Sequence, residues 1–206
     1  MNVRRGVKIG LALLAVAALV SALLFLRMLR YGFSALDEPT RIEAALAQRT
    51  RRWSVPADLR NVKNPVALTP EVLAEARAHF ADHCASCHGN DGKGQTPVGK
   101  HLYPKAPDMS AVETQSRSDG ELFSAIENGI RLTGMPGWGE GTAESAYGSW
   151  TLVHLVRHLP KITPEEIAEM EAMNPMSPGE MKERQAEEDF LAGEDAPAGD
   201  HAAHSH

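Results

Sequence analysis

Hydrophobic and polar positions divide the chain into four segments, of which the first is the most apolar. Residues 9–26 contain a single polar side chain, Ser21. As a helix rising about 1.5 Å per residue, this stretch would measure roughly 27 Å, close to the bilayer hydrocarbon thickness of about 30 Å. Basic residues flank it on both sides: Arg4, Arg5, Lys8, Arg27 and Arg30. We predict that residues 1–33 are a membrane anchor, with residues 9–26 in the bilayer.

A cleaved signal peptide is the alternative interpretation of this segment. Its apolar run is longer than the roughly 7–15 residues of a signal sequence, and arginines follow where a cleavage site needs small neutral residues. Residues 32–34, Gly-Phe-Ser, nevertheless offer a small-x-small site. The basic residues before the run slightly outnumber those after it, which favours a cytoplasmic N-terminus.

Residues 34–68 form a polar second segment. Three prolines interrupt it: Pro39, Pro56 and Pro65. Apolar positions at helical spacing predict one short helix between residues 37 and 52. The arginines at the end of this helix (49, 51 and 52) could lie near anionic headgroups or form a solvated helix end. We interpret the segment as a tether between the membrane and a folded domain.

Residues 69–160 form the folded domain. Thr69-Pro70 is a typical N-cap followed by proline at the first helical position, and apolar residues follow at positions 72, 73, 76 and 80. A capping box at residues 118–121 starts a second helix, and residues 144–159 predict a third. No segment shows the alternation of a strand. The fold class that we predict is therefore all-α.

Residues 161–206 are acidic, and we expect them to be peripheral. Capping boxes at residues 163–166 and 177–180 predict two short helices. The tail that follows Gly193 has too few apolar side chains to pack. It ends in His201, His204 and His206, which could bind copper, the alternative being a tail that only adds solubility.

The amino-acid composition excludes several classes of partner and of metal site. The 206 residues carry a net charge of −6, so the chain lacks the basic face that nucleic-acid phosphates require, and we predict no nucleic-acid partner. Aromatic residues are few (five Phe, three Trp, three Tyr), which indicates a small core or one filled partly by a non-protein group. Two cysteines are too few for a disulfide-stapled scaffold or a four-cysteine zinc site.

Both cysteines lie in Cys84-Ala85-Ser86-Cys87-His88, the pattern of covalent c-type haem attachment. Two thiols at this spacing can reach both vinyl groups of a porphyrin, and the adjoining imidazole of His88 can bind the iron axially. A thioredoxin-like cysteine pair would need a βαβ setting, and structural zinc would need a fourth ligand. We therefore predict one haem c, bound through Cys84 and Cys87.

The second axial ligand is predicted in the loop Thr133-Gly134-Met135-Pro136-Gly137-Trp138-Gly139. Glycines allow close approach of the backbone to a porphyrin, and Met135 offers a thioether sulfur. The alternative is that Met135 only fills core space. Other candidate ligands are ordinary surface or helix residues in our interpretation: His101, His154 and His158.

Residues 69–160 resemble a monohaem class I c-type cytochrome, on the strength of the Cys84–His88 motif and the Met135 loop in this order. The resemblance implies a small helical domain around one covalent haem, with His88 and Met135 as iron ligands. It also implies that the helix before the motif crosses the last helix through an aromatic contact of Phe80 with Trp150 or Tyr147.

The resemblance further implies roles for residues in two loops. The carbonyl of Pro107, or alternatively of Pro104, would accept a hydrogen bond from His88 and so orient its imidazole. Trp138 and Arg131 are candidates for contacts with the haem propionates. The family says nothing of the anchor, the acidic extension or the histidine tail.

These inferences predict one-electron transfer and no enzymatic reaction, because two protein ligands leave the iron no open position. We place the protein in the cytoplasmic membrane as a single-pass protein, its haem domain in the periplasm between a redox donor and a redox acceptor. One alternative is a fixed haem subunit of a larger respiratory complex, docked through the helices at 164–173 and 178–191. Another is a gas sensor or minor peroxidase from whose iron Met135 dissociates.

Overall fold

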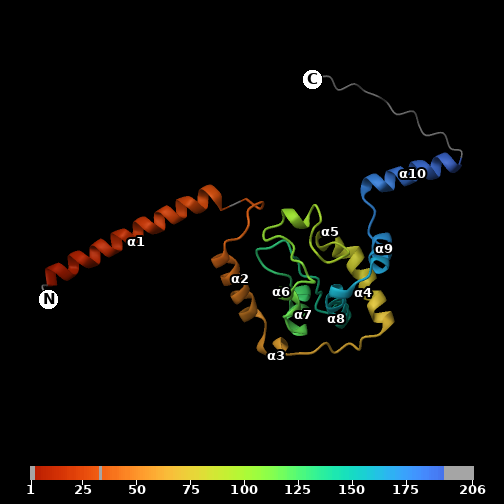
Figure 1. Ribbon diagram of the computed structural model, residues 1–206, viewed down its shortest axis with the longest axis horizontal. Helices are drawn as coiled ribbons and strands as arrows, with labels where there is room; N and C mark the ends of the chain where they lie inside the picture. Colours follow the sequence, from red (N-terminus) through yellow and green to blue (C-terminus); the bar gives the residue numbers. More distant parts are fainter. Residues whose placement is uncertain (1–2, 33, 193–206) are drawn as a thin grey trace, which may run out of the picture.

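The computed structural model describes residues 3–32 and 34–192, and within these ranges all regular structure is helical (Figure 1). The predicted all-α class is confirmed. The histidines at 201, 204 and 206 lie outside the described residues, so copper binding there stays a prediction.

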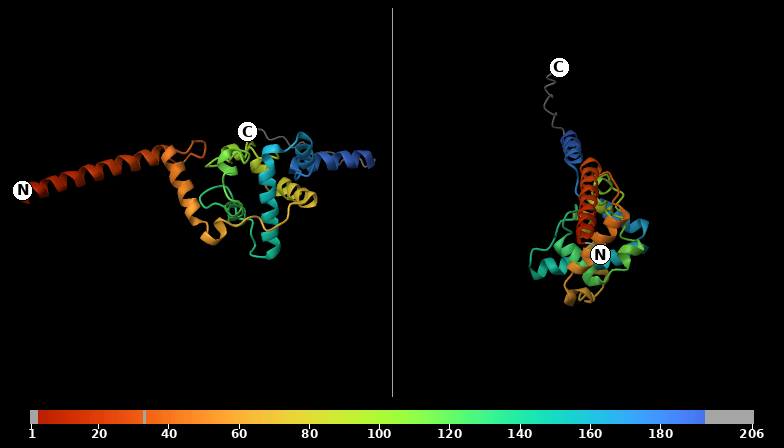
Figure 2. Two further views of the ribbon diagram at one scale, coloured as in Figure 1. Left: turned by 60° about the horizontal axis from the view of Figure 1, so that its bottom comes forward. Right: turned by 90° about the vertical axis from the view of Figure 1, so that its left-hand side faces the viewer.

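The first helix, α1 (Val3–Tyr31), extends away from the rest of the protein, as Figure 1 and the left view of Figure 2 show. Within its stretch Gly6–Arg30, the most apolar 18-residue window has a mean hydropathy of 2.8, and none of that window is buried against other parts of the described chain. By length and composition it can cross a membrane, as a retained anchor or as a signal sequence.

The segment predicted as a tether contains two helices, α2 (Arg41–Ser54) and α3 (Ala57–Arg60). The residues after α2 pack on the domain, since Val55 is buried and Leu59 contacts the core. The side-chain amide of Asn64 donates to the carbonyl of Trp150 at 2.8 Å, and its backbone N–H donates to Asp119 at 3.2 Å. The second half of this segment is thus part of the folded unit.

The domain is built on α4 (Pro70–His83), α7 (Asp119–Asn128) and α8 (Ala143–His158). Their starts follow local capping: the hydroxyl of Thr69 accepts from the N–H of Val72, and the predicted capping box of Ser118 and Glu121 is formed. Short helical turns fill the connections: α5 (Ala85–His88), η1 (Gly99–His101), α6 (Val112–Gln115) and η2 (Leu159–Lys161).

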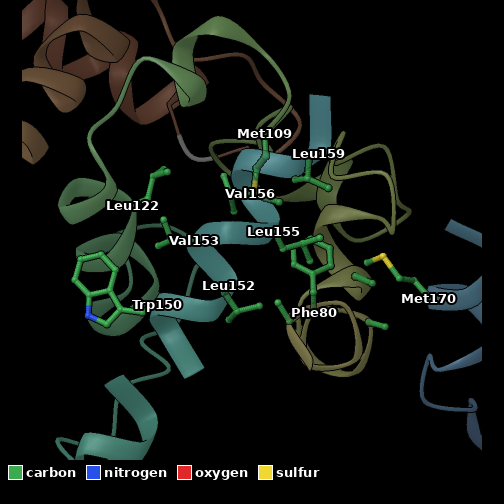
Figure 3. Packing of buried hydrophobic residues seen from close by; sticks show 13 residues of the cluster. Phe80, Met109, Leu122, Trp150, Leu152, Val153, Leu155, Val156, Leu159 and Met170 are labelled. Atoms are coloured by element: carbon green, nitrogen blue, oxygen red, sulfur yellow. The ribbon is translucent and has the colours of Figure 1, made fainter. Parts of the chain in front are cut away.

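The core lies where α8 packs against α4 on one side and α7 on the other (Figure 3). Phe80 of α4 lies beside Leu152 and Leu155 (Figure 3). Farther along the same face of α8, a Cβ on Gly148 would lie 3.3 Å from the ring of His79, so the two helices approach closely there.

The predicted aromatic contact of Phe80 in α4 with Trp150 or Tyr147 in α8 is wrong, because Trp150 packs on another ring. Trp150 stacks on Phe123 of α7, with ring centroids 4.2 Å apart. Two residues of helix turn through about 200°, so a side chain at position 150 points away from the Leu152 face that meets α4. Tyr147 reaches α4 through its hydroxyl, which donates to Glu75 at 3.3 Å.

Of the two helices in the acidic extension, α9 (Pro164–Ala172) is not peripheral as expected. Met170 is completely buried in the core, and Glu166 accepts from Arg77 of α4 at 3.1 Å. Capping boxes start both α9 and α10 (Pro178–Ala192), as predicted. The residues of α10 are exposed apart from a few positions, and this helix projects from the domain (Figure 1).

Candidate functional site

The cysteine–histidine motif begins where α4 ends. The N–H of Cys84 still donates to the carbonyl of Phe80 at 2.8 Å, and the chain then makes the single turn α5, which ends at Gly89 with a φ of 72°. Positions 84, 87 and 88 fall on one face of such a turn. The thiols of Cys84 and Cys87 are not disulfide-bonded and are half-buried. Burial raises the pKa of the Cys84 thiol to about 12.

The loop after the motif is tied to its backbone. The hydroxyl of Thr96 donates to the carbonyl of Cys87 at 3.0 Å and accepts from the N–H of Gly99 at 2.8 Å. The N–H of Gly94 donates to the carbonyl of His88 at 2.7 Å. A Cβ on Gly94 would lie 2.3 Å from the carbonyl oxygen of Ala106, so the backbone at these two points of the loop is in direct contact. The loop therefore returns at Ala106 to the backbone that follows the motif.

The imidazole of His88 is half-buried, and burial lowers its pKa, which favours the neutral ring. Its Nδ1 atom is buried without a hydrogen-bond partner among the described residues. The bond to Pro107 or Pro104 is therefore not formed in this structure, and both prolines are exposed. The role of Pro107 stays a prediction. A neutral imidazole is the form that binds a metal centre.

The Met135 loop is closed by its own hydrogen bonds. The N–H of Ile130 donates to the carbonyl of Met135 at 3.0 Å, and the hydroxyl of Thr133 accepts from the N–H of Met135 at 3.1 Å. At the base of the loop, a Cβ on Gly129 would lie 2.4 Å from the backbone nitrogen of Gly137. The side chain of Met135 is half-buried, and Met135 contacts His88. The structure thus brings the two predicted iron ligands together.

Trp138 fixes the far end of this loop. Its ring stacks on His83, the residue before Cys84, with ring centroids 5.3 Å apart. The backbone N–H of Trp138 donates to the carbonyl of Ile126 at 3.1 Å. At the near end, a Cβ on Gly134 would lie 2.6 Å from the side chain of Leu102. The loop is therefore held at both ends by residues that flank the attachment motif. Propionate contacts of Trp138 and of Arg131, which is exposed, stay predictions.

The other candidate iron ligands are engaged elsewhere. A ring nitrogen of His154 lies 2.8 Å from the carbonyl of Val66, and one of His101 lies 2.6 Å from the carbonyl of Pro97. His158 lies 2.9 Å from a carboxylate oxygen of Glu166. In the described part of the chain, no three His, Cys, Asp or Glu side chains cluster to hold a metal ion.

Sequence reasoning missed His83 and Thr96, which support the site without belonging to the motif. His83 is adjacent to Cys84, but its stacking on Trp138 joins distant segments and leaves no local trace. Thr96 has a local signal, because a threonine three residues before a glycine often bonds to the following backbone N–H.

Two comparisons bear on the site. A family model described as "Cytochrome C oxidase, cbb3-type, subunit III" matches residues 71–155, less than half of the chain but including Cys84, Cys87, His88 and Met135. No curated protein matches the chain significantly. The match begins in α4 and ends in α8, so it covers the segments that form the site.

Proposed function

We propose that residues 71–155, which match the family model and carry the attachment motif, form a class I c-type cytochrome domain with one covalent haem c. In this proposal the protein carries single electrons outside the cytoplasm while anchored to the membrane. His88 and Met135 are the iron ligands in this proposal. Bound haem supplies an iron that alternates between the ferric and ferrous states.

The contact between His88 and Met135 carries the proposal. The imidazole of His88 is half-buried, and burial lowers its pKa, which favours the neutral form that binds a metal. The thioether comes from a loop that is closed by its own backbone bonds and held at both ends. With haem bound, His88 and Met135 would supply a nitrogen and a soft sulfur donor to the iron, a ligand set that would leave no open position for a substrate and would favour the ferrous state.

Other residues hold these ligands in place. The thiols of Cys84 and Cys87 hold the cofactor covalently, and the Thr96 bridge fixes the backbone between them and the following loop. Phe80 and Leu155 exclude water from the helix that carries the motif. A site that does not rearrange between two redox states favours rapid electron transfer, because little reorganisation is needed.

The proposed location in the cytoplasmic membrane, with the haem domain in the periplasm, is supported by α1 and its flanking charges. An apolar stretch of this length suits the hydrocarbon core of a bilayer, and its most apolar window is not buried against the described chain. The slight excess of basic residues before it favours a cytoplasmic N-terminus. Redox donors and acceptors of such a protein dock through small, transient interfaces.

Optical spectra of the ferric and ferrous holoprotein test the ligands. We expect a ferric sulfur-to-iron charge-transfer band that is lost in Met135→Leu, with a midpoint potential lower on the order of 0.1 V. Met109→Leu is the matched control, because it removes another buried thioether outside the loop. A band that persists in Met135→Leu would exclude Met135, and rapid carbon monoxide binding by the unmodified protein would favour the sensor alternative.

The family description favours one second candidate, a fixed haem subunit of a larger oxidase complex. Of the two helices expected to dock, α9 packs on α4, so α10 is the one free to bind a partner. Deleting residues 177–206 leaves α9 intact. Loss of co-purification with a partner complex would support this function, and unchanged assembly would exclude α10 as its docking surface.

A further inference from the structure

Helix α2 has one face turned to the haem domain. Ala44 and Arg51 are its partly buried positions, and Val55, which ends the helix, is buried. At about 100° per residue, these three positions lie along one line of the helix. This line is the side through which α2 packs.

The opposite face of α2 is apolar and exposed. Ile42, Leu46 and Trp53 are 81%, 66% and 71% exposed. With Arg49 they fall within about 60° of one another and point away from the packed line. The guanidinium of Arg49 lies over the ring of Trp53, 5.7 Å from its centroid. We call these four residues the α2 stripe. Because the α2 stripe points away from the domain, it does not cover the domain's own site.

The charges of α2 favour an anionic surface. Four arginines lie on the helix, at positions 41, 49, 51 and 52, and only Arg51 is partly buried. Its one acidic residue, Glu43, accepts a hydrogen bond from the hydroxyl of Tyr103, a bond that raises the pKa of Tyr103 to about 12. The exposed charge of the helix is therefore mainly positive.

Contacts hold α2 at a defined orientation on the domain. Besides the Glu43–Tyr103 bond, Lys105 forms an ion pair with Glu38, just before the helix. Arg60 donates to the carbonyl of Val55 at 3.1 Å. Tyr103 and Lys105 belong to the loop that leads to Pro107. The α2 stripe is thus coupled to the loop on the His88 side of the site.

The short connection between α1 and α2 indicates that the partner of the α2 stripe is the membrane. The apolar stretch of α1 ends at Arg30 and α2 begins at Arg41. The intervening residues 31–40 reach at most about 35 Å when fully extended. An amphipathic helix with Trp and Leu on one face and arginines beside them, placed this close to a bilayer, has the composition of an interfacial helix.

We infer that α2 lies on the surface of the membrane that α1 spans, with the α2 stripe buried among anionic lipid headgroups. The inference rests on the proposed membrane anchor. It adds that the haem domain is held in one orientation, because α2 is fixed both to lipid and to the loop of Tyr103 and Lys105. A freely swinging domain would leave the α2 stripe in water.

Spin labelling of the full-length holoprotein in lipid nanodiscs tests this. Both native cysteines are consumed by haem attachment, so an added cysteine is the single free thiol. Leu46→Cys labels the α2 stripe, and Gln48→Cys is the control, an exposed position about 160° away on the same helix. With anionic lipid, we expect a several-fold higher ratio of oxygen to nickel-chelate accessibility at position 46 than at position 48.

A third label, Leu14→Cys in α1, separates the two proposals. High oxygen accessibility at position 14 with equal ratios at 46 and 48 would overturn the α2 inference while the anchor stands. A water-exposed label at position 14 would overturn the anchor itself. Spin–spin broadening at position 46 would also overturn the inference, since it would show a second copy on the α2 stripe. Replacing Arg49 and Arg52 by Gln should lower the ratio at 46 in anionic discs only.

Discussion

Gly99 shows how closely the backbone must approach the attachment motif. A Cβ at this position would lie 2.2 Å from the carbonyl oxygen of Cys87 and 2.6 Å from that of Gly94. Both atoms belong to backbone that is fixed by hydrogen bonds, so neither can move without disturbing the site. The residue type is dictated by space here, since Gly99 does not need a positive φ.

We predict that Gly99→Ala lowers the free energy of unfolding of the holoprotein by about 1–3 kcal/mol, because the added methyl group forces the loop away from Cys87. Denaturant unfolding measures the effect. Gly179→Ala is the control, since a Cβ there has only a contact of 3.8 Å, with the hydroxyl of Ser177. Equal stability of the Gly99 variant and the native protein would contradict this prediction.

Among the helices, α9 illustrates how an ion pair and one apolar side chain turn an acidic extension into part of the core. Met170 is buried, and the carboxylate of Glu166 meets both Arg77, at 3.1 Å, and His158, at 2.9 Å. Burial tends to raise the pKa of Glu166, but hydrogen bonds from His158 and from the backbone of Thr163, with the charges of His158 and Arg77, bring it below its ordinary value.

This lowered pKa predicts a pH-dependent contribution to stability. The ionised carboxylate stabilises the fold above its unfolded-state pKa, about 4.3, and that stability is lost as the pH falls through the lower folded-state pKa. Glu166→Gln should therefore cost about 1–2 kcal/mol at pH 7, and its unfolding curve should approach that of the native protein below about pH 4. The exposed neighbour Glu165→Gln should change little at either pH. A difference that persists unchanged into acid would contradict the linkage.

At the scale of the whole molecule, the protein's own core occupies only part of the domain. Buried apolar residues concentrate where α4, α7 and α8 meet. Two large apolar side chains are exposed in the loops next to the site: Val98, beside Gly99, and Leu132, in the turn before Met135. A flat apolar cofactor would supply much of the missing buried area.

We accordingly predict that the domain does not fold cooperatively without haem. The variant Cys84→Ala, Cys87→Ala should show reduced helicity and no cooperative thermal transition by far-ultraviolet circular dichroism, compared with the native holoprotein in the same detergent. The detergent and α1 contribute equally to both samples. A native-like transition in the haem-free variant would refute the prediction.

Much of the fold could be predicted locally. The helix starts at Thr69, Ser118, Thr163 and Ser177 follow from side chains that bond to backbone three residues away. The attachment motif is equally local, and the contact of its His88 with Met135 agrees with the prediction. What could not be predicted was which helix faces meet: Trp150 against Phe123, His83 against Trp138, and Met170 in the core.

The sequence by itself determined the helical class, the starts of the capped helices and the cysteine–histidine motif, because each depends on residues within one or two turns of one another. Only the tertiary structure decided the rotation of each helix about its axis, and with it the outward direction of the α2 stripe and the inclusion of α9. Rotation depends on how distant apolar surfaces share a limited core, and that competition has no signature in any single segment.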